Sequence, residues 1–279
     1  MSLQHHILLG PEHLEGNGGL GRYVLVPGDP GRADRIATHL KDVEKRGNPR
    51  GHHAHLGHLE DDVEGGPVDV LVISSGMGSG SSEIILQELL ACGARRLVRV
   101  GSCGSMTEAI APGQVVIATG AVRDERTTHD YAPPEFPALA HPAAVEALRA
   151  GARSEGLAEE TFLGICHSKA SFYAREFGHG PAGKANLEYC AWLRRCGVVA
   201  SEMEASTLFV LAAAASGPPA PIGGSAPSDC QAGAVLAVYA TDDPERDFAP
   251  ALAVESERKA IRVALAGVSV WAARDRSGG

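Results

Sequence analysis

With 279 residues, 44% of them hydrophobic, the chain is long enough to bury one large α/β core, and less suited to two small ones. The formal net charge of −9 argues against DNA or RNA as a partner, so any anion site has to be a local cluster of arginines. No apolar run reaches membrane-spanning length, and the first residues lack the charged start and hydrophobic core of a signal peptide. Six cysteines without paired short spacing add to the expectation of a cytoplasmic protein with free thiols.

The order of the predicted elements indicates the fold class. Short apolar runs predict strands at residues 23–26, 68–74, 97–100, 115–120, 162–166 and 235–239. Helices are expected at residues 33–40, 83–91, 143–156, 187–196, 206–215 and 253–273. Because strands and helices alternate, we expect one α/β domain over residues 1–279, with a largely parallel sheet between two helical layers. Residues 216–231 contain four prolines and are expected to form a loop or flexible insertion.

The first strand runs into a turn that suits phosphate. Pro27-Gly-Asp-Pro-Gly-Arg32 follows the strand directly, and a helix follows the turn. A helix N-terminus carries partial positive charge, and the Arg32 guanidinium can make paired hydrogen bonds to an oxyanion. A plain turn shaped by two prolines explains the same residues, so the motif alone leaves both interpretations open.

Four histidines lie close together in Arg50-Gly-His-His-Ala-His-Leu-Gly-His58. A metal site needs ligands that converge from one surface, whereas this spacing is more typical of an exposed strand or loop. We therefore predict no metal site here. The next strand enters Ser75-Gly-Met-Gly-Ser-Gly-Ser-Ser82, which fits a phosphate or a ribose but does not match a dinucleotide fingerprint.

The segment Arg96-Leu-Val-Arg-Val-Gly-Ser-Cys-Gly-Ser105 places Arg99 inside a buried strand that is expected to end in a Gly/Ser turn. A buried charge is costly unless it is paired, and such a turn exposes backbone N–H groups that hold an anion. Cation and turn together describe an oxyanion pocket. A snorkelling Arg at a strand edge fits the stretch equally well.

Two acids stand at the start of the most apolar predicted helix. Glu202 and Glu204 flank Met203 at a strand–helix junction, where they either cap the helix or bind the hydroxyls of a sugar. Earlier in the chain, Ser171-Phe-Tyr173 follows a predicted strand. Its aromatic rings either stack on a ligand or fill the core.

These stretches together resemble the nucleoside phosphorylase family that contains uridine phosphorylase and the hexameric bacterial purine nucleoside phosphorylases. The resemblance covers nearly the whole chain. It rests on six motifs in the family's order, namely Val26-Pro-Gly-Asp-Pro-Gly-Arg32, Arg50-Gly51, Ser75-Gly-Met-Gly78, Arg99-Val-Gly-Ser-Cys-Gly104, Phe172-Tyr173 and Ser201-Glu-Met-Glu-Ala205. It implies a three-layer α/β/α fold with a partly barrel-like sheet. It also implies phosphate-dependent cleavage of a nucleoside, with phosphate as co-substrate and neither a metal nor an organic cofactor.

The resemblance implies site residues as well. A phosphate site is implied at Gly28, Arg32, Arg99 and Ser102, with Arg50 reaching in from a neighbouring subunit. A ribose site is implied at Met203 and Glu204 with Glu202 beside them, and at His6 (or else His5) of the neighbouring subunit. Phe172 is implied to pack on the sugar or the base. Arg99 and Glu204 then carry the chemistry, because arginines position the nucleophile and a carboxylate favours an electron-poor transition state.

The base pocket departs from the family pattern. Uridine phosphorylases follow the Phe-Tyr pair with a Gln and an Arg, whereas this chain has Ala174-Arg-Glu-Phe-Gly-His-Gly180. The candidate substitutes are Arg175, Glu176 and His179. Purine-cleaving members carry a Ser-Asp or Ser-Asn pair after the last strand, where this chain has Tyr239-Ala240, and Asp242 acts as the acid only if the loop is re-registered. The length of the segment between Phe172 and Glu202 is closer to the uridine type.

The leading hypothesis is therefore a phosphorylase of uridine or a related pyrimidine nucleoside. A purine nucleoside phosphorylase and a non-catalytic nucleoside-binding relative are the alternatives, while three arginines in phosphate positions argue against a hydrolase. Because Arg50 and the N-terminal histidine serve a neighbouring site, we expect a dimer as the active unit and a hexamer as the full assembly.

Overall fold

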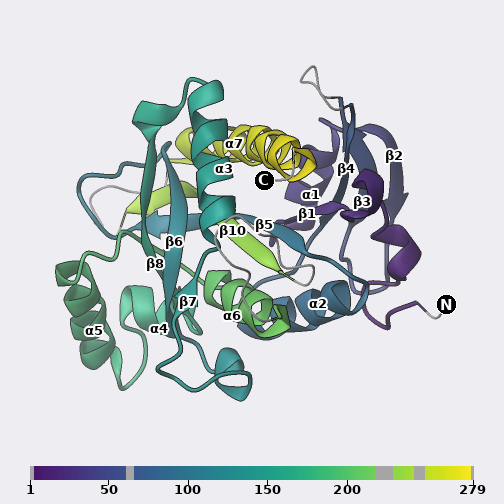
Figure 1. Ribbon diagram of the computed structural model, residues 1–279. Coiled ribbons are helices and arrows are strands. Elements are labelled where there is room, and N and C mark those ends of the chain that lie inside the picture. The colour runs from purple at the N-terminus through teal and green to yellow at the C-terminus, as the bar shows by residue number, and fades with distance from the viewer. Residues whose placement is uncertain (1–2, 61–65, 218–228, 242–248, 278–279) are drawn as a thin grey trace.

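The computed structural model describes residues 3–60, 66–217, 229–241 and 249–277, which form ten strands and seven α-helices (Figure 1). The strands are β1 (Tyr23–Val26), β2 (Lys41–Arg46), β3 (Ala54–Leu59), β4 (Val68–Ile73), β5 (Arg96–Ser105), β6 (Val115–Asp124), β7 (Ala138–Leu139), β8 (Thr161–Lys169), β9 (Ala200–Glu202) and β10 (Gln231–Thr241). The helices are α1 (Pro30–Ala37), α2 (Ser79–Ala91), α3 (Pro142–Ser154), α4 (Phe172–Phe177), α5 (Gly183–Arg195), α6 (Ala205–Ala215) and α7 (Pro250–Arg276). Among these helices, none combines the length and apolar character that a bilayer span requires.

The sheet closes on itself around β5. Its order is β10-β6-β8-β9-β5-β1-β4-β3-β2, and β5 also pairs with β10, so five strands form a ring. Parallel pairs join β5 to β1 and β10, while antiparallel pairs join β5 to β9 and β10 to β6. The predicted α/β fold with a partly barrel-like sheet is confirmed, and the sheet is mixed.

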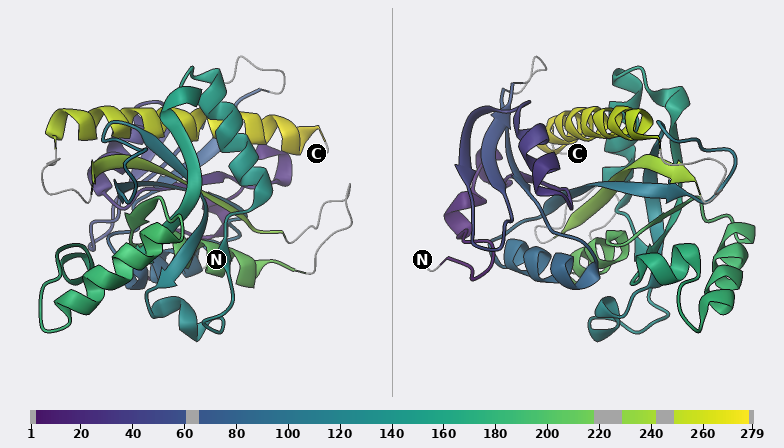
Figure 2. Two further views of the ribbon diagram at one scale, coloured as in Figure 1. Left: turned by 90° about the vertical axis from the view of Figure 1, so that its left-hand side faces the viewer. Right: turned by 180° about the vertical axis from the view of Figure 1, so that it is seen from behind.

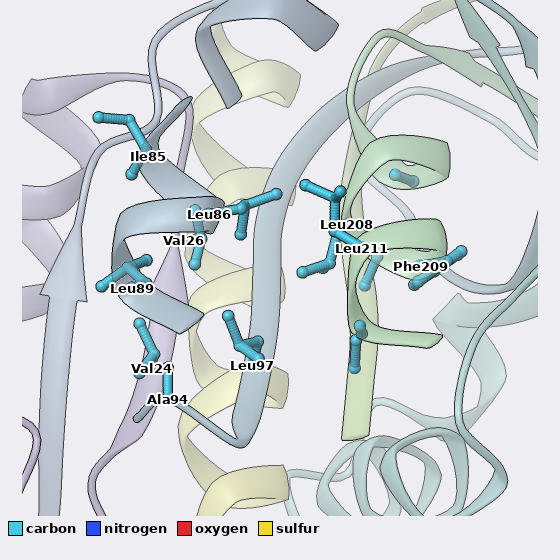
Figure 3. Close-up of a cluster of buried hydrophobic side chains, with 14 of the residues drawn as sticks. Val24, Val26, Ile85, Leu86, Leu89, Ala94, Leu97, Leu208, Phe209 and Leu211 are labelled. Carbon is cyan, nitrogen blue, oxygen red and sulfur yellow. The ribbon is translucent and has the colours of Figure 1, made fainter. Parts of the chain in front are cut away.

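Successive side chains along the strands point to opposite faces of the sheet, so the core has two layers. Val24 and Val26 of β1 pack with Leu97 of β5 against α2 and α6, as Figure 3 shows. Their neighbours in sequence point to the opposite face, which α1, α3 and α7 cover (Figure 2). The strands β1 and β5 are thus packed between two helical layers.

Two segments differ from the sequence prediction. The run of histidines was expected in an exposed strand or loop, but β3 is mostly buried because it pairs with β2 on one side and β4 on the other. The Gly/Ser stretch after Val100 was expected to be a turn. It instead continues β5 as far as Ser105, since β10 and β9 supply hydrogen-bonding partners there.

Close packing of α3 on α7 depends on Gly151. A Cβ added at Gly151 would lie only 2.4 Å from the backbone nitrogen of Gly267. We expect Gly151→Ala to destabilise the protein by about 2 kcal/mol, since the two helices would have to separate. Urea unfolding measures the effect, with Gly80→Ala as control, because a Cβ at Gly80 meets nothing within 4 Å. Equal midpoints for the two variants would contradict this packing.

Candidate active site

Arg99 and two glutamates form a buried charged cluster where β5 meets the start of α6. Arg99 Nε lies 3.0 Å from Glu202 Oε2, and its Nη2 lies 2.5 Å from Glu204 Oε2. All three side chains are buried. Burial lowers the pKa of Arg99, but Glu204 and Glu202 raise it by more, so the guanidinium stays charged. Arg99 is thus a paired interior cation rather than a snorkelling side chain.

Glu202 holds this cluster in shape. Its carboxylate accepts hydrogen bonds from the backbone N–H groups of Glu204, at 2.8 Å, and Ala205, at 2.9 Å. It also accepts from the Ser168 hydroxyl of β8. These contacts satisfy the first turn of α6 and fix Arg99 relative to β8, so Glu202 has little acceptor capacity left for a ligand.

Glu204 connects the cluster to the loop before α2. Its Oε1 accepts from the backbone N–H of Gly78 at 2.5 Å, and Gly78 has φ +84°, a conformation that favours glycine. Burial raises the pKa of Glu204, an effect that Arg99 opposes. With one oxygen held by the loop and the other by Arg99, this carboxylate is rigidly placed.

One nitrogen of the Arg99 guanidinium has no partner among the described residues. Its Nη1 is buried and makes no hydrogen bond to any described residue. Gly28 lies beside it, because a Cβ built on Gly28 would come within 4.0 Å of Nη1. Buried guanidinium nitrogens are rarely left without a partner, so an oxyanion between the Gly28 turn and Arg99 would complete the site.

Arg32, the second predicted phosphate residue, is buried, and each of its terminal nitrogens is engaged. Nε lies 2.9 Å from Glu257, Nη1 donates to the Val100 carbonyl at 3.0 Å, and Nη2 donates to the Tyr239 hydroxyl at 2.7 Å. Arg32 therefore braces the turn against α7 and β10. Nη1 and Nη2 each carry a second N–H, so contact with phosphate does not require these bonds to break.

Of the remaining predicted phosphate and ribose residues, Ser102 and Met203 adjoin the cluster in sequence, whereas Arg50, His6 and His5 lie on other segments. Ser102 is half-buried in β5, three residues beyond Arg99, and Met203 is half-buried between the two glutamates. Arg50 is exposed, and no carboxylate in the described part of the chain pairs with it. His6 Nδ1 lies 2.6 Å from Glu88 Oε1 in α2, while His5 is exposed.

The predicted base residues gather on α4. Phe172 is 45% exposed at the start of this helix. Arg175 is directed to Asp124, 2.7 Å away, and to Asn186 Oδ1 at 2.6 Å, with its guanidinium over the Tyr189 ring. Glu176 instead turns towards β8, where it meets Lys169.

Lys169 is a buried charged residue that the sequence analysis did not identify. It ends β8, directly before the predicted ligand-stacking segment, and is only 2% exposed. The signal was available, since a lysine at the end of a buried strand raises the same question as Arg99 in β5. Asp242, the candidate acid, and residues 218–228 of the predicted insertion lie outside the described residues.

Two of the four clustered histidines meet an aspartate. His53 Nδ1 and His55 Nε2 lie 3.0 and 2.8 Å from the Asp34 carboxylate, and Lys45 Nζ also lies 2.8 Å from it. Hydrogen bonds to Lys45 and the histidines lower the pKa of Asp34 to about 2, against the effect of its burial. Asp34 thus anchors α1 to β2 through an ion pair with Lys45 and to β3 through its hydrogen bond with His55.

Comparisons with known proteins agree with this geometry. A family model described as the phosphorylase superfamily matches residues 22–263. Uridine phosphorylase from Treponema pallidum is 34% identical over 258 residues, 92% of this chain and 92% of that protein. Guanosine phosphorylase from Halorubrum lacusprofundi is 30% identical over 212 residues, 76% of this chain and 78% of that protein. A crystal structure of uridine phosphorylase from Vibrio fischeri ES114 has a TM-score of 0.74 at 25% identity, covering 96% of this chain and 98% of that chain.

The family match spans most of the sequence, and the Treponema relative matches over nearly the full length of both chains. Four of the motifs that carry the resemblance meet at the buried Arg99 cluster, through Gly28, Gly78, Arg99 and the Glu202–Glu204 pair. The chain therefore belongs to the phosphorylase superfamily, among its nucleoside phosphorylases.

Proposed function

We propose that this protein is a pentosyltransferase that cleaves the N-glycosidic bond of a uridine-like pyrimidine nucleoside with inorganic phosphate. The products are the free base and ribose 1-phosphate. The observation that carries the proposal is Arg99, a buried cation with one unpaired nitrogen beside the Gly28 turn and two carboxylates on its other side. Phosphate bound at Arg99 and ribose hydroxyls bound at Glu204 would lie next to each other.

The chemistry requires few parts. Phosphate displaces the base from the anomeric carbon, and positive charge builds on the ribose as the glycosidic bond loosens. Arg99 orients the nucleophile, which supplies catalysis through positioning, and the Glu204 carboxylate stabilises the electron-poor sugar. The proposal includes phosphate as co-substrate and no metal or organic cofactor.

A purine nucleoside is the second candidate substrate. One observation favours it: β10 ends at Thr241, so Asp242 directly follows the last strand, where an acid could protonate a purine. The guanosine phosphorylase among the relatives is consistent with this possibility.

A nucleoside panel tests the proposed function. Uridine, cytidine, inosine, guanosine and adenosine are each incubated with the protein, with and without phosphate, and base release is followed. Phosphate-dependent release that is fastest from uridine supports the proposal, and fastest release from inosine or guanosine supports the second candidate. Tight binding without product from any nucleoside would make the chain a binding protein and contradict both.

We further propose that the site is shared between subunits of a dimer, and that dimers assemble into a hexamer. Arg50 has no carboxylate partner among the described residues, and its exposed position leaves it free to reach a neighbouring phosphate site. Six free cysteines are consistent with a reducing compartment such as the cytoplasm.

Arg50→Ala is expected to raise the KM for phosphate by about tenfold or more, because it removes a charge-assisted contact without disturbing the core. Arg258→Ala, which removes another exposed arginine, is the control. Mixing Arg50→Ala with Arg99→Ala subunits should restore activity, since a hybrid dimer holds one site with both arginines. Absence of rescue despite proven subunit exchange would contradict the shared site.

A further inference from the structure

Lys169 is an unusual residue to find inside a protein. It lies at the carboxyl end of β8, is 2% exposed and ranks among the largest fully buried side chains. An ammonium group loses its hydration on burial, so it is retained only where charged or polar groups surround it. Here Nζ lies 2.5 Å from Glu176 Oε1 and 2.8 Å from Ser201 Oγ.

This pair stands next to the ribose carboxylates. Ser201 directly precedes Glu202 in β9, and Ser168, the neighbour of Lys169 in β8, donates to Glu202. The Lys169 ammonium lies 5.5 Å from the centroid of the Phe172 ring. A base that stacks on Phe172 while its ribose meets Glu204 would therefore have Lys169 within reach of its edge.

Lys169 and Glu176 are complementary to a base edge that presents one hydrogen-bond acceptor and one donor. The ammonium only donates hydrogen bonds, and the carboxylate only accepts them. Lys169 outweighs burial and lowers the pKa of Glu176, so the carboxyl is ionised. Arg175, the other polar candidate on α4, is held by Asp124 and Asn186. Glu176 is therefore the polar candidate on α4 that can contact the base.

We propose that Lys169 and Glu176 read the base: Lys169 donates to the ring carbonyl beside the scissile nitrogen, and Glu176 accepts from the adjacent ring N–H. This inference rests on the proposed function and names its substrate class, a base with neighbouring carbonyl and N–H groups, such as uracil. Cytosine lacks the ring N–H and would place a lone pair against the Glu176 carboxylate.

Lys169 also takes part in the reaction. The bond between a phosphate oxygen and the anomeric carbon forms as the glycosidic bond breaks, and the electron pair of the broken bond goes to the base. The negative charge spreads onto the carbonyl oxygen, where the ammonium stabilises it. Hydrogen phosphate gives up its proton on becoming an ester, and the base takes up one proton, so the step balances.

The test compares leaving groups of different acidity. Lys169→Met is assayed with uridine and with 5-fluorouridine, whose fluorinated base bears negative charge more readily. We expect kcat/KM for uridine to fall about a hundredfold or more, and the loss with 5-fluorouridine to be clearly smaller. Lys184→Met, at a lysine side chain that is 91% exposed on α5, is the matched control and should retain wild-type rates.

The outcomes separate a catalytic from a structural role. Equal losses with both nucleosides, or full activity of Lys169→Met, would overturn the proposal. Should that variant fail to fold, Glu176→Gln carries the test, because it keeps the size of the side chain while offering a donor. It should reduce the preference for uridine over cytidine by about tenfold or more, and an unchanged preference would overturn the proposal. A folded wild-type protein that releases no base in the presence of phosphate would instead contradict the proposed function itself.

Discussion

Replacement of Arg99 by Met is expected to abolish phosphorolysis, with kcat/KM lowered by about a thousandfold or more. The guanidinium contacts both glutamates and keeps a nitrogen beside the Gly28 turn that has no partner among the described residues. Its loss removes the positive charge that we propose positions phosphate, and it leaves Glu204 without its partner. Steady-state kinetics with varied phosphate measure the effect.

Arg99→Met is also expected to lower the free energy of unfolding by about 3–5 kcal/mol, since it leaves two buried carboxylates without their cation. Arg99→Lys separates this loss from the loss of catalysis. A lysine keeps the charge and has three donors, but all three sit on one nitrogen and cannot reproduce the planar fork that meets Glu202, Glu204 and the Gly28 turn from separate nitrogens. We expect a folded protein with a strongly raised KM for phosphate. Wild-type kinetics of Arg99→Lys would contradict the role assigned to the guanidinium.

Glu204→Gln is expected to lower kcat by about a hundredfold and to change the KM for phosphate much less. Glutamine can still accept from the Gly78 N–H, so the loop before α2 should keep its place, but the negative charge that we propose faces the ribose is lost. Kinetics with both substrates varied distinguish these parameters.

Glu188→Gln, an exposed side chain on α5, is the control for this charge change and should leave kcat unaltered. A kcat for Glu204→Gln within about twofold of the wild type would mean that the carboxylate does not stabilise the transition state.

Local pattern accounts for most of the fold. The strands β1, β4 and β10 and the helix α6 were predicted from the sequence. Each contains a run of consecutive apolar residues, and such runs indicate a buried element. The strand β2 was missed, since Lys41-Asp-Val-Glu-Lys-Arg46 is an exposed edge whose charges discourage pairing with other chains. Its formation depends on β3, a partner that periodicity does not reveal.

The site was predicted unevenly for a similar reason. Arg99, Glu202 and Glu204 were identified from the sequence as candidate site residues, and the structure brings them together. The two glutamates differ in which backbone N–H groups they accept from: Glu204 accepts from Gly78 and Glu202 from Ala205. These hydrogen-bond partners are set by the folded structure and cannot be derived from the local sequence pattern.

The pairing of Lys169 with Glu176 is a further case. The two residues lie on opposite sides of the β8–α4 turn, and nothing in the local pattern indicates that Arg175 points away while Glu176 points inward. Side-chain direction in a short helix is set by its neighbours, here Asp124 and Asn186 on one side and Ser201 on the other.

The central claim is that phosphate, rather than water, displaces the base. The most direct test is to incubate the protein with uridine and phosphate and to quantify uracil and ribose 1-phosphate in the same sample, the ester by its phosphorus resonance. The account predicts one ribose 1-phosphate for each uracil and no uracil when phosphate is left out. Release of uracil with free ribose, at a rate independent of phosphate, would contradict it.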